Sequence, residues 1–128
     1  MRQILIVEDD ESIHAGLRAL FLEEGYTVMD AFTGKQALDL LRGINLPLVV
    51  LLDWRLPDMD GGQVFATAHA EMPSDHGQAF IFCTANSDTL PLATVRLMAE
   101  MHVPLVRKPF DIDELLEVVA DAADSLVA

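Results

Sequence analysis

The 128-residue chain contains one cysteine, Cys83, and only 8 lysine and arginine residues against 21 acidic ones. A single thiol excludes an internal disulfide bond and a cysteine-based zinc site, and its place in an apolar run indicates a buried strand residue. The net charge of −13 argues against direct binding of nucleic acid or an anionic membrane, because such surfaces cluster Lys and Arg. The acidity suits a metal cation or a basic partner.

Long apolar runs are also missing, and no stretch approaches the length of a membrane span or forms a secretory leader. We therefore expect a soluble, cytoplasmic protein. Repeats, low-complexity tracts and linkers are absent too. The composition is 52% apolar, which favours folding, and the length is that of one domain. Residues 1–128 are expected to form a single domain with no output domain behind it.

Five short apolar runs alternate with five amphipathic stretches. The runs predict strands at residues 4–7, 27–31, 49–53, 79–83 and 103–106, the last interrupted by Pro104 and therefore at an edge. The amphipathic stretches predict helices at about 11–25, 34–42, 62–72 and 91–101, the first opened by an acidic residue such as Asp10, and a last helix that Asp111 or Asp113 opens and that continues almost to Ala128. Five β-then-α units predict an α/β fold with a parallel sheet and helices on both faces.

The run at 49–53 ends on a carboxylate, Asp53, and Pro57 with Gly61 then forces a loop. Sites in open α/β sheets lie at the carboxyl ends of the strands. Two strand orders are common, and in the flavodoxin-like order 2-1-3-4-5 the tips of strands one, three, four and five line one crevice. Those tips carry Glu8, Asp9, Asp53, Thr84, Arg107 and Lys108.

Carboxylates gathered in one crevice repel each other, so they favour a bound cation. Oxygen ligands suit Mg²⁺, which makes the corner after the first strand a predicted metal corner. A nucleotide-binding sheet would place glycines in this first turn, and there are none. A carboxylate can also be phosphorylated to an acyl phosphate if positive charge faces the transferred oxygens. Lys108 can supply that charge, and Thr84 and the N–H of Ala85 can donate hydrogen bonds.

Four motifs in this order resemble the receiver domain of two-component response regulators over essentially the whole chain. They are the acidic pair Glu8-Asp9, the loop with Asp53, Pro57, Met59, Asp60 and Gly61, the pair Thr84-Ala85, and the run Lys108, Pro109 and Phe110. The resemblance implies a flavodoxin-like (βα)5 fold with strand order 2-1-3-4-5. It also implies a signalling switch, not an enzyme beyond its own phosphotransfer and autodephosphorylation.

The resemblance also implies the roles of individual residues. Asp53 would accept a phosphoryl group from a histidine kinase or a histidine phosphotransfer protein, and the phosphorylated chain would change its affinity for a downstream protein partner or output domain. Asp9 and Asp53 would ligate Mg²⁺, with help from Glu8 and the backbone carbonyl of Arg55. Thr84 and Lys108 would contact the phosphoryl group. The Lys108–Pro109 peptide bond would be cis.

Some positions depart from the family pattern. The family couples the strand-four threonine to an aromatic side chain three residues before the lysine, where this chain has Leu105. Arg55 and Asn86 occupy positions that tune dephosphorylation in the family. The apolar residues of the fourth helix exceed one stripe, which indicates either core burial or an exposed partner or dimer surface on the strand-four to strand-five face; they are Leu90, Leu92, Val95, Leu97, Met98 and Met101.

Two rival functions are considered. A Mg²⁺-dependent phosphohydrolase with an aspartyl-phosphate intermediate usually needs a second acid two residues after the nucleophile, and that position is Arg55. A receiver-like binding module that is never phosphorylated is disfavoured by its complete set of reactive residues. Among the remaining polar residues, Asp10, Glu11, Asp58 and Asp60 are assigned to helix starts and turns. The histidines His14, His69, His76 and His102 share no ligand spacing and are assigned to the surface.

Overall fold

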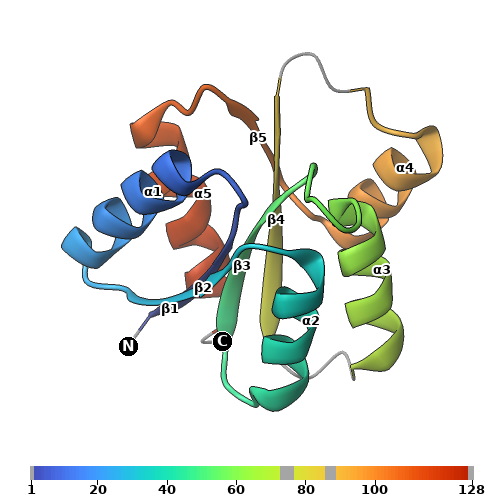
Figure 1. Ribbon diagram of the computed structural model, residues 1–128, viewed down its shortest axis with the longest axis horizontal. Coiled ribbons are helices and arrows are strands. Elements are labelled where there is room, and N and C mark those ends of the chain that lie inside the picture. Colours follow the sequence, from blue (N-terminus) through green and yellow to red (C-terminus); the bar gives the residue numbers. More distant parts are fainter. Residues whose placement is uncertain (1, 73–76, 86–88, 127–128) are drawn as a thin grey trace.

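In the computed structural model, five parallel strands form one sheet with the order β2-β1-β3-β4-β5, placed between two layers of helices (Figure 1). The structure describes residues 2–72, 77–85 and 89–126. The elements are β1 (Gln3–Val7), α1 (Glu11–Glu23), β2 (Thr27–Ala31), α2 (Gly34–Gly43), β3 (Leu48–Asp53), α3 (Gly61–Glu71), β4 (Gln78–Ala85), α4 (Leu92–Met101), β5 (Leu105–Lys108) and α5 (Ile112–Ser125). The predicted flavodoxin-like fold is confirmed.

The core is divided in two by the sheet. Alternate residues of a strand point to opposite faces, so β3 contributes Val49 and Leu51 to the cluster beneath α1 and α5, and Val50 and Leu52 to the cluster beneath α2 and α3. Figure 1 shows the same division, with α1 and α5 on one side of the sheet and α2, α3 and α4 on the other. Every residue of β3 is buried, which fixes Asp53 at the end of the most protected strand.

Side-chain caps begin four of the helices. Asp10, Thr33, Asp60 and Asp111 each accept a hydrogen bond from a backbone N–H in the first turn of the helix that follows. At α3 the cap is reciprocal, because the Gln63 side chain also accepts from the Asp60 N–H. The predictions that Asp10, Asp60 and Asp111 lie at helix starts or turns are therefore confirmed.

The last two strands differ from their predicted bounds. β4 continues two residues beyond the predicted end at 83, and β5 begins at Leu105 and not at Val103. The Val103 N–H bonds to the Met98 carbonyl and thus closes the end of α4, while Pro104 has no N–H to give to a sheet. Within the described ranges, no helix has the length and hydropathy of a membrane span.

Candidate functional site

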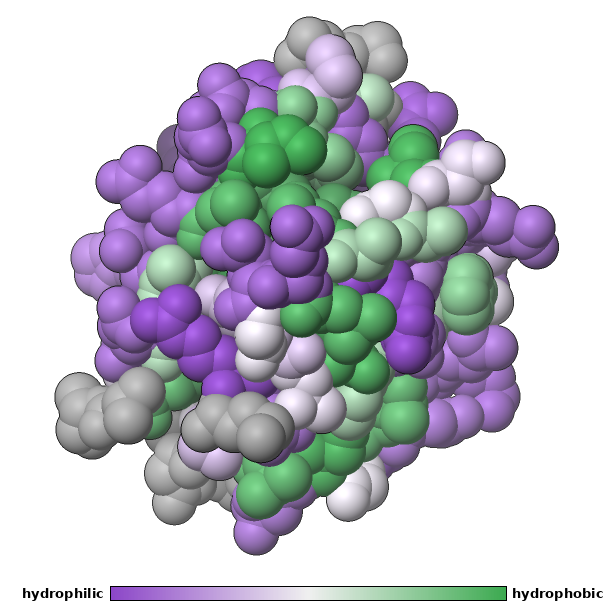
Figure 2. All heavy atoms as spheres, turned by 90° about the vertical axis from the view of Figure 1, so that its left-hand side faces the viewer, coloured by the Kyte–Doolittle hydropathy of each residue, from purple (hydrophilic) through white to green (hydrophobic). Residues whose placement is uncertain are grey.

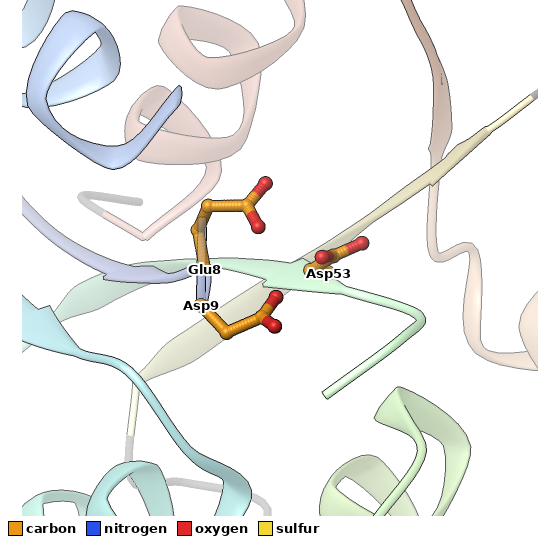
Figure 3. A group of neighbouring side chains, drawn as sticks. All are labelled: Glu8, Asp9 and Asp53. Carbon is orange, nitrogen blue, oxygen red and sulfur yellow. The ribbon is translucent and has the colours of Figure 1, made fainter. Parts of the chain in front are cut away.

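Three carboxylates meet at the carboxyl end of the sheet. Glu8 and Asp9 directly follow β1, and Asp53 is the last residue of β3, which pairs with β1 so that Val7 lies opposite Leu52. Figure 3 shows the two acids after β1 directed toward Asp53. One oxygen of each carboxylate lies within 4.8 Å of the others. The sequence-predicted acidic corner is therefore present, with Glu8 and Asp53 buried and Asp9 exposed.

Lys108 lies between two of these carboxylates. Its Nζ is 2.5 Å from Glu8 Oε1 and 3.3 Å from Asp53 Oδ2, and its side chain is mostly buried. The lysine ends β5, where it pairs with Ala85, and the peptide bond to Pro109 is cis as expected. The ammonium group of Lys108, at the end of β5, therefore lies at the same end of the sheet as the three acids.

Thr84 lies one residue beyond the pairing of Asp53 with Cys83. Its side chain is buried, and the hydroxyl donates to the Ala85 carbonyl at 3.2 Å. This places the hydroxyl at the same end of the sheet as the acids, as predicted. Arg55 follows Asp53 in the loop, where an isolated bridge pairs it with Asp60.

The electrostatics of the site follow from burial and crowding. Burial raises the pKa of Asp53 to about 7, and the neighbouring Glu8 carboxylate adds to the rise, while Lys108 opposes it. Burial by itself lowers the pKa of Lys108, but the hydrogen bond to Glu8 and the charges of both carboxylates outweigh it, so the pKa is raised. Lys108 brings one positive charge to a cluster of three carboxyl groups, so a bound cation would favour their charged forms.

Glu8 is held in place from the side of α1. The Asp10 N–H donates to Glu8 Oε2 at 3.2 Å, and His14 Nδ1 lies 2.9 Å from the Glu8 carbonyl oxygen. The other ring nitrogen of His14 is 2.7 Å from Asp30 on β2. The expectation that His14 is a surface residue is wrong, since it is 2% exposed. Nothing in the sequence other than its place on the α1 stripe could have pointed to this role.

The loop after β3 is fastened to its surroundings. Asp58 accepts hydrogen bonds from the N–H groups of Gly34 (2.8 Å) and Lys35 (2.9 Å), at the start of α2. At the other end, the Gly61 N–H donates to the Trp54 carbonyl at 2.7 Å. The loop that carries Asp53 and Arg55 is therefore tied to two helices. Asn86, which the resemblance linked to dephosphorylation, lies outside the described residues.

A comparison with known families identifies this arrangement. Residues 4–120 match the response regulator receiver domain. The chain belongs to this family. The receiver domain is 35% identical over 118 residues to sporulation initiation phosphotransferase F of Bacillus subtilis (strain 168), covering 91% of this chain and 90% of that protein. It is also 34% identical over 123 residues to the regulatory protein AtoC of Escherichia coli (strain K12), covering 95% of this chain but only 25% of that protein.

Solved structures agree with the receiver fold. A CheY-like response regulator receiver domain protein from Methanospirillum hungatei JF-1 superposes with a TM-score of 0.81 at 25% identity, covering 97% of this chain and 95% of that one. The recognition of a two-component receiver domain from its four motifs is thus confirmed. Leu105 occupies the position where the family pattern has an aromatic residue, and its side chain packs partly buried against the core on the α2 and α3 side.

Proposed function

We propose that this receiver domain is a phosphorylatable switch, in which Asp53 accepts a phosphoryl group from the phosphohistidine of a histidine kinase or a histidine phosphotransfer protein. The observation that carries the proposal is the packing of Glu8, Asp9, Asp53 and Lys108 at one end of the sheet. In the transfer, a carboxylate oxygen of Asp53 bonds to phosphorus as the phosphorus–nitrogen bond to imidazole breaks, and the imidazole leaves with the electron pair. The product is an acyl phosphate.

The donor set fits Mg²⁺, because it consists of carboxylate oxygens that lie within 4.8 Å of each other. Asp9 and Asp53 would hold the ion, assisted by Glu8 and the backbone carbonyl of Arg55. When bound, Mg²⁺ would supply positive charge to the phosphoryl oxygens. Lys108, already 3.3 Å from Asp53, would contribute its ammonium to the phosphoryl oxygens, and the Thr84 hydroxyl would donate to the same group.

The phosphorylated domain would contact its partner through the face formed by β4, α4 and β5. Three apolar side chains of α4 are well exposed, namely Leu92 (64%), Val95 (45%) and Met101 (41%). They suit contact with a downstream protein partner, an output domain or a second receiver. The net charge of −13 favours a protein partner over nucleic acid, and we propose a cytoplasmic location for such a switch.

Phosphorylation by acetyl phosphate and Mg²⁺, followed by intact-mass measurement, tests the proposal. We expect the mass of one phosphoryl group to be added to the natural chain and to Asp39→Asn, whose carboxylate is exposed on α2. The gain should disappear in Asp53→Asn and after chelation of the metal. Multiple turnover of small phosphate esters would instead support the phosphohydrolase, and an unmodified natural chain would support the binding module that is not phosphorylated.

A further inference from the structure

A cavity of about 600 Å³ lies at the end of the sheet away from the acidic cluster. It opens beside the first half of β4, between α3, the end of α4 and α5. Mostly apolar side chains line it, including Phe65, Met72, Phe80, Met101, Val103 and Val118. Its size is that of a small-molecule site, and none of its lining residues belongs to the acidic cluster.

The first half of β4 has an uncovered edge at this cavity. β5 pairs with β4 only from Phe82 onward, so no strand among the described residues pairs with residues 78–81 on that side. The Trp54 N–H bonds to the Cys83 carbonyl, whereas the Phe82 N–H bonds to Pro104. Odd-numbered residues of β4 therefore direct their backbone groups to β3, and even-numbered ones, including Phe80, direct them to the uncovered edge.

The residues before β5 cannot complete this edge. In a continued parallel ladder the N–H of residue 104 would bond to the Phe80 carbonyl, but that residue is proline. The Val103 N–H is already bonded to Met98. In the part of the chain that the structure describes, no hydrogen bond crosses this edge from Phe80. One N–H and one C=O thus lie side by side in an apolar setting.

A second observation points to a ligand at the same place. Gln78 also lines the cavity, and its side-chain Nε2 is buried with no hydrogen-bond partner among the described residues. Buried donors without partners are rare in folded proteins and need a specific explanation, such as a bound molecule. Because this nitrogen is buried, an acceptor in the cavity would supply the missing bond only once the Gln78 side chain turned toward the cavity.

We propose that this cavity binds a small, uncharged, planar molecule with adjacent N–H and C=O groups, of the lactam or heteroaromatic amide class. The N–H and C=O would pair with the backbone of Phe80, and the ring would pack between Phe65 and Val118. An anion is disfavoured by the nearby Asp121 and by the chain's net charge of −13. A peptide strand is disfavoured because only Gln78 and Phe80 direct backbone groups to the uncovered edge before β5 takes over at Phe82, which is too short a stretch for an added strand.

Amide-resolved NMR of the whole chain tests the proposal with carbostyril, the benzo-fused lactam, as the probe. N-methylcarbostyril is the matched control, because it keeps the ring and the carbonyl but lacks the N–H. We expect carbostyril to bind with a Kd of about 1 mM or tighter and to shift the Phe80 and Val103 amides. The methylated probe should bind at least about tenfold more weakly.

A pair of variants on α5 localises the site. Ala122→Phe places a ring in the cavity, whereas Ala120→Phe on the same helix lies off its lining. Carbostyril binding should be lost in the first and kept in the second, with both folds checked by circular dichroism. Equal binding of the two probes to the natural chain, shifts confined to other regions, or no shift up to the probe's solubility would each overturn the proposal, even if Ala122→Phe fails to fold.

Discussion

Asp53 occupies an unfavourable place for a negative charge, and this is a physical basis for the reactivity that we propose for it. It is 6% exposed, at the end of a wholly buried strand, with the Glu8 carboxylate nearby. Lys108 opposes these effects through its charge and its hydrogen bond to Asp53. A bound cation would stabilise the charged form of such a buried carboxylate. Phosphorylation would add phosphoryl oxygens that can also bind the cation.

The first prediction is that Asp53→Asn stabilises the metal-free protein at high pH. The folded-state pKa of about 7 exceeds the ordinary 3.8, so the folded chain binds the additional proton between these values and loses stability as the pH rises through them. The variant does not titrate there. Its free energy of unfolding should exceed that of the natural chain by about 1–3 kcal/mol at pH 8 and by little at pH 4.

Urea denaturation in the presence of a chelator, at several pH values, measures this difference. Asp39→Asn serves as the control, because that carboxylate is exposed and its pKa is lowered by the hydrogen bond from Lys35. A stabilisation by Asp53→Asn that does not change between pH 4 and pH 8 would contradict the assigned electrostatics.

Residue types and their order along the chain sufficed to predict the acids, the threonine and the lysine of the site, because strand ends are visible in an apolar pattern. His14 could not be predicted in this way. Its partners, the Glu8 carbonyl and the Asp30 carboxylate, come from two other elements and meet it only after folding. Its ring also stacks on Phe32, with centroids 4.2 Å apart. A histidine on a helix stripe carries no local sign of such partners.

At the scale of elements, the loop between β3 and α3 is fixed by hydrogen bonds to two helices. Asp58 ties it to the first turn of α2, and Asp60 caps α3. The pKa of Asp58 is lowered because the hydrogen bonds from Gly34 and Lys35 outweigh the effect of burial. Its stabilising contribution is therefore present above the ordinary carboxyl pKa and is lost as the pH falls below it.

The second prediction concerns this tie. Asp58→Ala leaves two N–H groups of α2 without their acceptor, so the free energy of unfolding should fall by about 1–2 kcal/mol at pH 7. Asp113→Ala is the matched control, since Asp113 lies in the first turn of α5 but is not its cap; its cost should be at most about 0.5 kcal/mol. Chemical denaturation measures both. Equal costs would show that Asp58 acts only through its charge.

The third prediction concerns the packing of α3 against the end of β3. A Cβ added at Gly61 would lie 2.7 Å from the Asp53 carbonyl oxygen and 3.1 Å from the Trp54 Cα, and neither backbone atom can move freely. Gly61→Ala should therefore lower the free energy of unfolding by about 2–4 kcal/mol and reduce the phosphorylation of Asp53. Gly16→Ala is the control, because a Cβ at this position on α1 meets nothing within 4 Å. It should raise the free energy of unfolding by about 0.5–1 kcal/mol, since alanine favours a helix more than glycine does. If Gly61→Ala left the free energy of unfolding unchanged, the close approach of position 61 to the backbone of Asp53 and Trp54 would be refuted.

Element bounds show where sequence patterns stop being informative. The second strand was predicted residue for residue, at 27–31. β5 was displaced by two residues because Val103 is as apolar as a strand residue, yet its N–H closes α4. On α1, helical spacing from Leu17 and Phe21 favours Ile13 as a buried apolar residue, but Ile13 is 36% exposed and His14 takes that place. These errors arise from hydrogen bonds between elements, which periodicity does not encode.

At the scale of the whole molecule, the excess of acid is divided between the surface and one strand-end cluster. Figure 2 shows the side that α1 and α5 occupy, where purple polar groups surround separate green apolar patches. Exposed carboxylates are screened by solvent and contribute little to stability. The carboxylates at the sheet end are partly removed from solvent, so a divalent cation should act mainly there.

The last prediction is that Mg²⁺ stabilises the fold through this cluster. A ligand that binds only the folded chain adds about 2.7 kcal/mol at a hundred times its Kd, which corresponds to a rise in Tm of roughly 10 °C for a domain of this size. The emission of Trp54, the single tryptophan, should change over the same titration because it adjoins Asp53. Asp9→Asn should lose most of both effects, whereas Asp39→Asn, on exposed α2, should keep them. Asp9 and Asp39 are both exposed, so general screening by magnesium would affect the two variants equally. Only a binding site that includes Asp9 would make the two responses differ, and equal responses would therefore contradict the prediction.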